Sequence, residues 1–357
     1  MKIGIPKEIK TLEGRVGLIP AACSSLVQEG HTVYIEKGAG ILSGYSDEEY
    51  KKSGVEFVDD AKSLYETAEL IVKVKEPVGP ELQLLQSHHL LFSYLHLAAE
   101  VPLMERLLEI GLTGVAFETV EENGGLPLLA PMSDIAGRIA TQVGMHLLHR
   151  PQGGKGLLLG GLPGADRGHV VIIGGGVVGA NAAIIAAGIG ARVTIFDRNR
   201  SKQEKLREIG PNVTALYPFP ELLAKAVTEA DLIIGAVLVT GEKAPHVVSR
   251  EMLKNMAAGG VVVDVSVDQG GCIETTRPTT YAEPTYVEEE IVHFCVTNMP
   301  GAVPRSSSQA LSASLLPYVI KLAQEDWREN ESLVKGINVD GGKLIHPALK
   351  QMFPDKV

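Results

Sequence analysis

The sequence predicts an α/β protein with two doubly wound, Rossmann-like domains and a cleft between them. Short apolar runs alternate with helical patterns from the N-terminus, and a second series of the same kind starts at Val170. Such alternation indicates parallel strands joined by right-handed crossovers, with helices on both faces of each sheet. A chain of 357 residues that is 45% hydrophobic also has enough apolar material for two ordinary cores.

The first series predicts five strands separated by four helices. The strands are expected at Lys2–Pro6, Thr32–Glu36, Leu70–Lys75, Leu90–His96 and Thr113–Glu118. The helices are expected near Ala21–Glu29, Asp47–Ser53, Pro80–Ser87 and Pro102–Ile110.

The second series predicts six strands, enough for a complete dinucleotide-binding sheet. They are expected at Val170–Ile173, Arg192–Phe196, Val213–Leu216, Leu232–Val237, Val261–Val265 and Ile291–Val296. The glycine-rich segment Arg150–Gly164 is expected to be a loop. After Pro304 the pattern turns helical, and we expect these C-terminal helices to return to the first domain. One domain would then comprise residues 1–128 and 305–357, and the other residues 129–304.

Composition excludes several classes of protein. A formal charge of -10 without a basic cluster argues against a nucleic-acid partner. Three widely spaced cysteines fit reduced thiols and form no metal-ligand cluster, so we expect no metal and a cytoplasmic location. The start lacks the pattern of a signal peptide. The segment Val170–Ala191 is uncharged and long enough to span a membrane, but its glycines favour a buried strand, turn and helix.

The pattern Gly-x-Gly-x-x-Gly follows the strand at Val170–Ile173 and opens an apolar helix. The first glycine permits a tight turn, the second lets the backbone approach a pyrophosphate, and the third allows close packing of helix on strand. A glycine-rich turn without a ligand is the alternative, but the surrounding strands and helix favour a cofactor site. The candidate cofactor-binding residues here are Gly174, Gly176, Val178 and Gly179.

Asp197 closes the next strand, about 20 residues after the glycines, where a carboxylate can accept hydrogen bonds from both ribose hydroxyls. NAD is therefore favoured over NADP. Arg198 and Arg200 lie beside it and could pair with a 2′-phosphate, which the carboxylate would oppose.

Ligands of open α/β sheets collect at the carboxyl ends of the strands, and three polar residues are expected there in the first domain. Arg15 follows the first strand, while Lys75 and His96 end two others. The two cations could hold a carboxylate, and the imidazole could donate to a carbonyl or amine. Each residue also has an interpretation without a role in function. Arg15 could be an arginine of a surface loop, Lys75 a lysine at a strand end beside Lys73, and His96 a polar residue whose hydrogen bonds are made within the fold.

Asp268 follows the fifth strand of the second domain, where its side chain would face the nicotinamide end of a dinucleotide. An aspartate turn before two glycines is the alternative.

With these residues, the chain resembles alanine dehydrogenases over essentially its whole length. The matching motifs are Gly4–Glu8, Val72–Pro77, Leu95–Ala98, Pro127–Ser133, the Gly174 motif, Gly235–Leu238, Asp268–Gly271 and Thr297–Pro300. The resemblance implies that Arg15 and Lys75 hold the carboxylate of L-alanine or pyruvate, that His96 polarises the reacting carbonyl or imine, and that Asp268 serves proton transfer.

The resemblance also implies ammonia as co-substrate, no membrane partner and a homo-hexamer. The residues that it implies in contact with NAD are Ser133, Asp197, Arg198, Lys202, Val237, Leu238, Val267, Asn298 and Met299. The chain departs from the family at Thr11–Gly14, where many relatives are rich in Asn, at Gly17, where Ala is usual, and at Val178. None of these changes removes a group that the chemistry needs.

Two alternatives remain open at this point. One is the soluble nucleotide-binding module of a proton-translocating transhydrogenase, which passes hydride to a second nucleotide and has no need of a carboxylate clamp. The other is an opine or lysine-pathway dehydrogenase, which keeps the fold and changes the substrate.

Overall fold

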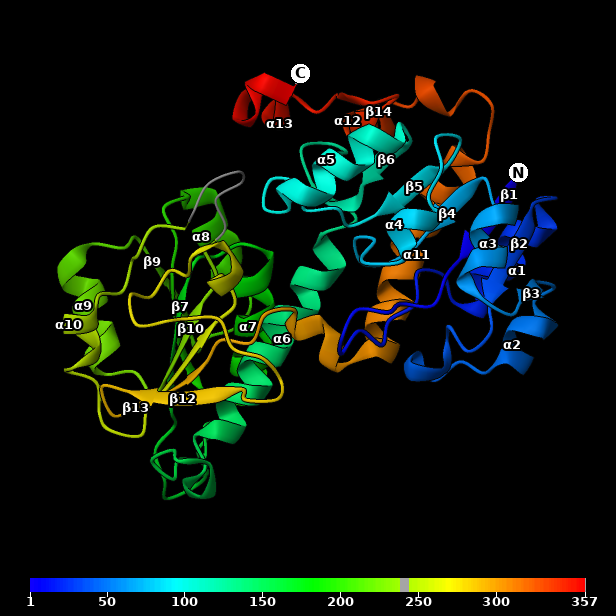
Figure 1. Ribbon diagram of the computed structural model, residues 1–357. Helices are drawn as coiled ribbons and strands as arrows, with labels where there is room; N and C mark the ends of the chain where they lie inside the picture. Colours follow the sequence, from blue (N-terminus) through cyan, green and yellow to red (C-terminus); the bar gives the residue numbers. More distant parts are fainter. Residues whose placement is uncertain (238–243, 357) are drawn as a thin grey trace. The chain divides into compact units, whose positions relative to one another are not determined.

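A computed structural model describes residues 1–237 and 244–356 of the protein. The chain divides into two compact units (Figure 1). Unit 1 comprises Met1–Met132 and Gly301–Val357, and unit 2 comprises Ser133–Pro300.

The described part of unit 1 contains an eight-stranded sheet in the order β15-β14-β6-β5-β4-β1-β2-β3. Strands β1 to β6 run parallel, in the order expected of a doubly wound sheet. The strands are β1 Lys2–Ile5, β2 Thr32–Glu36, β3 Glu56–Val58, β4 Leu70–Val72, β5 Leu90–Ser93, β6 Thr113–Ala116, β14 Ile337–Asp340 and β15 Lys343–Leu344. The helices are α1 Pro20–Gln28, α2 Asp47–Lys52, α3 Ala61–Thr67, α4 Glu81–Leu84, α5 Val101–Ile110, α11 Pro304–Leu322, α12 Glu331–Lys335 and α13 Pro347–Met352.

Unit 2 contains a seven-stranded sheet in the order β12-β13-β11-β10-β7-β8-β9 within its described residues. All neighbours are parallel except β12 and β13. The strands are β7 His169–Ile173, β8 Arg192–Phe196, β9 Val213–Leu216, β10 Leu232–Gly235, β11 Val261–Asp264, β12 Thr285–Glu288 and β13 Ile291–Phe294. The helices are α7 Val177–Gly188, α8 Arg200–Arg207, α9 Pro220–Thr228 and α10 Arg250–Leu253, and α6 Ala130–Leu147 spans the boundary between the units.

Both predicted doubly wound α/β layers are confirmed. In each sheet the strand order reverses at one point, between β1 and β4 in unit 1 and between β7 and β10 in unit 2. Ligands of such sheets bind outside the carboxyl ends of the strands at this switch point. Each unit therefore presents a candidate ligand site in the loops that follow its own two switch-point strands.

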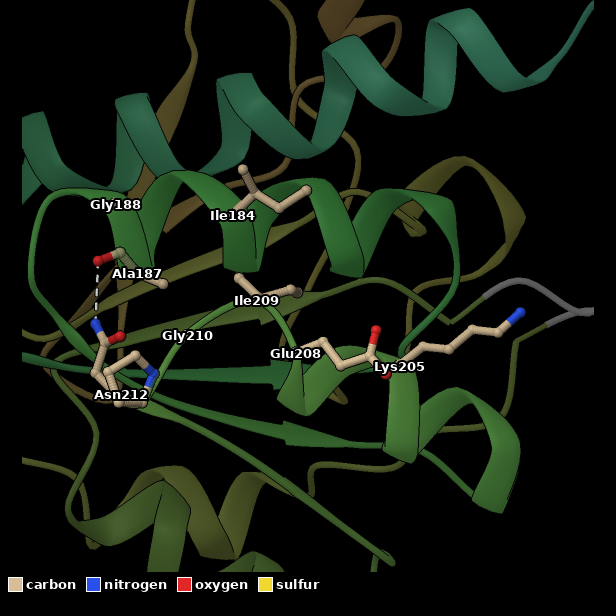
Figure 2. A pocket seen from close by; sticks show the side chains of 9 residues that line it. Ile184, Ala187, Gly188, Lys205, Glu208, Ile209, Gly210 and Asn212 are labelled. Atoms are coloured by element: carbon tan, nitrogen blue, oxygen red, sulfur yellow. Dashed lines mark hydrogen bonds between the residues drawn. The ribbon is translucent and has the colours of Figure 1, made fainter.

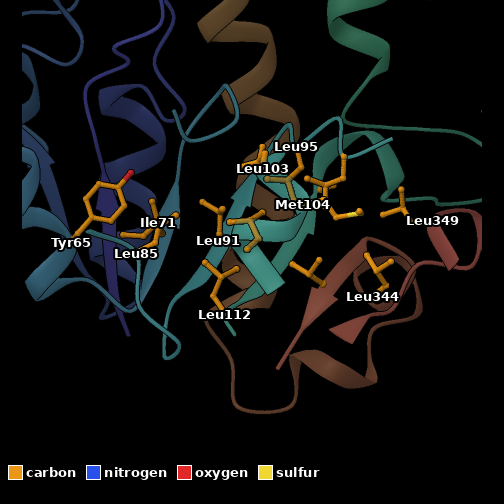
Figure 3. Packing of buried hydrophobic residues seen from close by; sticks show 14 of the residues in the cluster. Tyr65, Ile71, Leu85, Leu91, Leu95, Leu103, Met104, Leu112, Leu344 and Leu349 are labelled. Atoms are coloured by element: carbon orange, nitrogen blue, oxygen red, sulfur yellow. The ribbon is translucent and has the colours of Figure 1, made fainter. Parts of the chain in front are cut away.

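A large apolar cluster joins the sheet of unit 1 to its helices (Figure 3). Leu91, Leu107 and Leu112 are fully buried in it, together with Val339 of the C-terminal strand β14. Burying one such side chain contributes about 1.5–3 kcal/mol. The cluster therefore fastens the returning C-terminal segment to the N-terminal sheet.

Several expected boundaries were wrong. Strand β4 ends at Val72 and β5 at Ser93, so Lys75 and His96 lie three residues beyond the strands that were expected to contain them. The returning segment also supplies two strands in addition to helices, because Ile337 pairs antiparallel with Val115 of β6. The segment Val170–Ala191 folds as strand, glycine turn and helix. Among the described residues, no helix is long and apolar enough to cross a membrane.

Candidate active site

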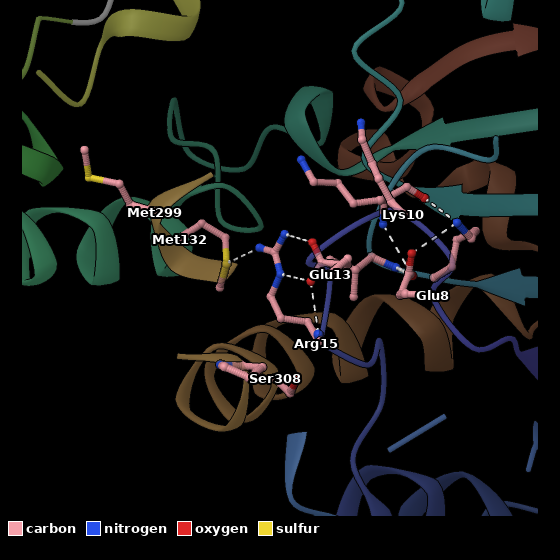
Figure 4. A network of polar contacts seen from close by, with 12 residues as sticks. Glu8, Lys10, Glu13, Arg15, Met132, Met299 and Ser308 are labelled. Atoms are coloured by element: carbon pink, nitrogen blue, oxygen red, sulfur yellow. Dashed lines mark hydrogen bonds and ion pairs between the residues drawn. The ribbon is translucent and has the colours of Figure 1, made fainter. Parts of the chain in front are cut away.

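Arg15 lies in the loop after β1, and only 2% of it is exposed. Its guanidinium forms a two-pronged ion pair with Glu13, in which Nε lies 2.7 Å from Oε1 and Nη2 lies 2.5 Å from Oε2 (Figure 4). Burial alone would lower the pKa of Arg15, but the bonds to Glu13 outweigh it and the pKa is raised. Glu13 therefore fixes the side chain and neutralises most of its charge.

The C-terminal helix α11 holds the loop that follows Arg15. The backbone N–H groups of Val16 and Ile19 donate to the hydroxyls of Ser308 and Ser312, each over 3.0 Å. Both serines are fully buried. The C-terminal helix returns to the first domain as predicted, and there it supports the loop that carries Arg15.

Lys75 is half-buried and lies beyond the end of β4. Its pKa is lowered, first by burial and then by the positive charge of Arg15. The two cations therefore lie within electrostatic reach of each other. Among the described residues no carboxylate forms an ion pair with Lys75, and the negative charges of Glu76 and Glu13 offset the effects of burial and Arg15 only in part.

His96 adopts a left-handed backbone conformation with φ of +50°, which is uncommon for a residue other than glycine. Glu118 stabilises this turn, because its Oε1 accepts the backbone N–H of His96 at 2.6 Å and that of Leu95 at 3.2 Å. The imidazole is exposed, with Nδ1 4.0 Å from the same carboxylate. It stacks on the ring of Tyr94, with an interplanar angle of 2° and centroids 5.7 Å apart.

Tyr94 links the histidine to the cations. Its hydroxyl donates to the carbonyl of Leu128 over 2.7 Å, and its ring is buried. Burial raises the pKa of Tyr94, while the charge of Arg15 lowers it in part. Unit 1 therefore brings Arg15, Lys75 and His96 to one edge of its sheet. The sequence assigned no role to Tyr94, Glu13 or Glu118.

The glycine loop of unit 2 has the geometry of a phosphate cradle. Gly174 has φ of +101°, and a Cβ there would lie 2.5 Å from the carbonyl oxygen of Ala236. A Cβ on Gly179 would lie 1.9 Å from the carbonyl oxygen of Gly174. At Gly176, which precedes α7, no atom of the described residues other than Gly176 and its chain neighbours lies within 4 Å of the Cβ position. The outer glycines are thus required by packing, and the central one leaves space for a ligand.

Asp197 follows β8 and is hydrogen-bonded to the glycine loop. Its Oδ2 accepts the N–H of Gly175 at 2.8 Å, and its Oδ1 accepts that of Asn199 at 2.7 Å. These bonds orient the carboxylate next to the cradle and leave lone pairs on both oxygens for further donors. Arg198 and Lys202 lie nearby in sequence and are exposed.

Asp268 is exposed in the 3₁₀ turn Val267–Gln269 after β11. The turn is anchored by Asp264, a fully buried carboxylate that the sequence did not single out. Asp264 accepts the N–H groups of Ser266 and Cys272 at 2.9 and 3.0 Å and the hydroxyl of Thr276 at 2.8 Å. The sequence does contain a signal for Asp264, because it is an aspartate at the end of an otherwise apolar strand.

Of the other predicted cofactor residues of unit 2, Val237 lies next to the glycine loop, and Val267 is buried in the 3₁₀ turn after β11. A Cβ on Gly174 would lie 3.1 Å from the backbone nitrogen of Val237, which places Val237 at the switch point. Ser133 lies in the first turn of α6, which packs closely on α7, since a Cβ on Gly137 would lie 2.1 Å from the carbonyl oxygen of Val178.

The remaining three cofactor positions differ in how far the structure describes them. Asn298 has φ of +61°, and the carbonyl of the buried Met299 accepts the hydroxyl of Tyr281 at 3.0 Å. Leu238 lies outside the described residues.

A hollow of about 540 Å³ on unit 2 is not part of this site (Figure 2). The end of α7, the end of α8 and the turn before β9 line it, and Asn212 there donates to the carbonyl of Ala187 over 3.0 Å. Helix α7 begins at the glycine loop and ends in this hollow. The hollow therefore lies at the opposite edge of the sheet.

Comparisons with known proteins agree over the whole chain. The family models described as alanine dehydrogenase/PNT, N-terminal domain and C-terminal domain, match residues 4–136 and 140–347. The alanine dehydrogenase of Halomonas elongata is 48% identical, with 99% of this chain and 97% of that protein covered.

Two solved structures resemble the fold to different degrees. An L-alanine dehydrogenase structure matches with a TM-score of 0.97 and 50% identity, and both chains are covered completely. A transhydrogenase structure from Sinorhizobium meliloti matches with a TM-score of 0.85 and 24% identity over 98% of this chain and 100% of that chain. The second likeness concerns the fold alone.

Proposed function

Because the chain belongs to the alanine dehydrogenase/PNT family, we propose that it catalyses the reversible NAD-dependent deamination of L-alanine to pyruvate and ammonia. One observation carries the choice of substrate. The ammonium of Lys75, which forms no ion pair among the described residues, lies within electrostatic reach of an arginine that Glu13 has oriented and largely neutralised. That arrangement has an excess positive charge and two donors for one small carboxylate.

The space and the charges around the glycine loop of unit 2 fit NAD. Gly176 leaves room for a pyrophosphate at the start of α7, a twelve-residue helix whose N-terminal N–H groups attract anions. Asp197 is oriented to accept the ribose hydroxyls and would repel a 2′-phosphate. Bound NAD would supply the hydride acceptor that amino-acid oxidation needs.

The residues of the chain supply orientation and proton transfer. Arg15 and Lys75 hold the carboxylate, so that the adjacent carbon is presented in one orientation. His96 donates a hydrogen bond to the oxygen or nitrogen on that carbon and exchanges a proton with it. Asp268 takes a proton from the water that attacks the imine and returns one as ammonia leaves.

The two alternatives make different demands on unit 1. A transhydrogenase module would leave Lys75 without a ligand. Burying the charged ammonium costs free energy, and in such a module no bound carboxylate would offset this cost. An opine or lysine-pathway enzyme would keep the clamp and accept a larger side chain. We further propose a cytoplasmic homo-hexamer, on the strength of the family resemblance.

The test is NADH formation by purified protein with a panel of L-amino acids. We expect the highest kcat/KM with L-alanine and lower values with serine and glycine. Activity with none of the panel, combined with hydride exchange between NADH and an NADP analogue, would instead favour the transhydrogenase function.

A further inference from the structure

A buried charged cluster lies directly beneath the Lys75 loop. The ammonium of Lys73 lies 3.2 Å from Oε2 of Glu8 and 3.3 Å from Oε1 of Glu81. All three side chains are at most 3% exposed. The mechanism proposed above uses none of them, although Lys73 is only two residues from Lys75.

The cluster binds the backbone around Lys75 on both sides. Lys73 Nζ donates to the carbonyl oxygens of Lys75 and Glu76 over 2.9 and 3.4 Å. Glu8 Oε1 accepts the N–H groups of Val74 and Lys75 at 2.6 and 3.4 Å, and Figure 4 shows this carboxylate in the polar network. Beyond the end of β4 at Val72, Lys73 N–H and the carbonyl of Val74 still bond to the backbone of Phe92 and Tyr94, and the side chains of Glu8 and Lys73 bond the backbone groups of residues 74–76 that this pairing leaves over.

Stability alone does not account for such a cluster. Removing charged groups from water costs several kcal/mol each, and apolar residues of similar volume often stabilise a core equally well. What the charged groups add is direction, since their hydrogen bonds fix the backbone on either side of the Lys75 Cα. Glu8 also ties the loop after β1 to the loop after β4, the two loops at the switch point of the sheet.

We propose that Glu8 and Lys73 are positioning residues that hold the Lys75 loop so that the Lys75 ammonium meets the substrate carboxylate. The inference rests on the proposed role of Lys75 in substrate binding. It assigns the two lysines of Lys73-Val74-Lys75 opposite functions, one buried as a support and one presented to the ligand.

The test compares Glu8→Gln and Lys73→Met with Glu69→Gln. Glu69 is a matched control because its Oε2 accepts the N–H of Lys2 at 2.7 Å and so joins the same two strands at their amino ends. We expect the KM for pyruvate to rise at least tenfold in the first two variants, with a smaller change in kcat. NADH binding, measured by fluorescence titration, should stay within twofold of wild type in all three.

A double-mutant cycle separates positioning from general destabilisation. If Glu8 acts through Lys75, the effect of Glu8→Gln on KM should disappear when Lys75 is already Ala. An equal effect in both backgrounds, or an unchanged KM in the single variants, would overturn the proposal. Should Lys73→Met fail to fold, Glu8→Gln still decides, because its amide oxygen can accept the N–H of Val74 and preserve the fold, while its amide nitrogen can no longer hold the Lys73 ammonium that supports the far side of the loop.

A second measurement does not depend on the activity. The rate at which acetic anhydride modifies Lys75, followed by mass spectrometry, should change severalfold in Glu8→Gln and stay at the wild-type value in Glu69→Gln. If wild type reduces no oxo acid, the proposed function fails while this measurement still tests the support of Lys75. An identical labelling rate in all three proteins would refute the support itself.

Discussion

Replacing Lys75 by Met should weaken substrate binding and at the same time stabilise the protein. Glu13 largely neutralises Arg15, whereas Lys75 has no ion-pair partner among the described residues, so its charge is available to attract the carboxylate. Two unit charges 4 Å apart attract by about 4 kcal/mol at an effective dielectric constant of 20. Water that replaces the ammonium recovers part of this, which leaves a loss of about 2–3 kcal/mol, or roughly 30- to 150-fold in Kd.

The sign of the stability change follows from the lowered pKa of Lys75. Well below that pKa, the ammonium is charged in both the native and the unfolded protein, and the full cost of burying it beside Arg15 is present. This cost is relieved as the pH rises from the native pKa toward the ordinary value of 10.5. Removing the charge should therefore raise the free energy of unfolding at pH 7.

The assay pairs urea unfolding at pH 7 with the KM for pyruvate. Lys75→Met should show a higher unfolding midpoint and a raised KM, whereas Lys52→Met, at an exposed lysine on α2, should change neither. In wild type, pyruvate binding should weaken as the pH rises through the pKa of Lys75. A destabilised Lys75→Met protein with normal KM would show that the lysine serves the fold and not the ligand.

Three further predictions concern single residues. Asp197→Ala should lower the NAD/NADP ratio of kcat/KM, and an unchanged ratio would remove the ribose assignment. His96→Ala and Asp268→Asn should each lower kcat by ~10²-fold or more, as expected of proton-transfer groups. Both variants should still bind NADH in fluorescence titrations. Normal turnover in either variant would contradict its catalytic role. Leu12 has φ of +62° and is exposed, so Leu12→Asn should stabilise by about 1 kcal/mol in urea unfolding, whereas Leu42→Asn, at an exposed residue without positive φ, should not.

The sequence predicted the central parallel strands of both sheets, but not β3, β12, β14 or β15. Long apolar strands such as Val170–Ile173 and the glycine spacing are local signals, and the structure has them as expected. Strand β14 and the edge strand β15 have no such signal, because both are short and β14 pairs with a segment more than 200 residues earlier in the chain. Contacts of that kind depend on tertiary packing and not on local propensity.

The charge relations within the site were also hidden in the sequence. The pattern Lys73-Val74-Lys75 predicted a strand that reaches Lys75, yet β4 ends at Val72 and Lys73 is held by the buried carboxylates of Glu8 and Glu81. Glu13 stood next to Arg15 in the sequence, but only the structure reveals the two-pronged pair. Spacing along the chain indicates which loops carry polar groups and does not indicate which of them neutralise one another.

The most direct test of the account uses L-alanine that carries deuterium at Cα. Purified protein should form NADH, pyruvate and ammonia in equal amounts, and mass spectrometry should find one deuterium in each NADH. NADH without deuterium, or no NADH at all, would contradict the claim that this chain moves hydride from the amino-acid carbon to the nicotinamide.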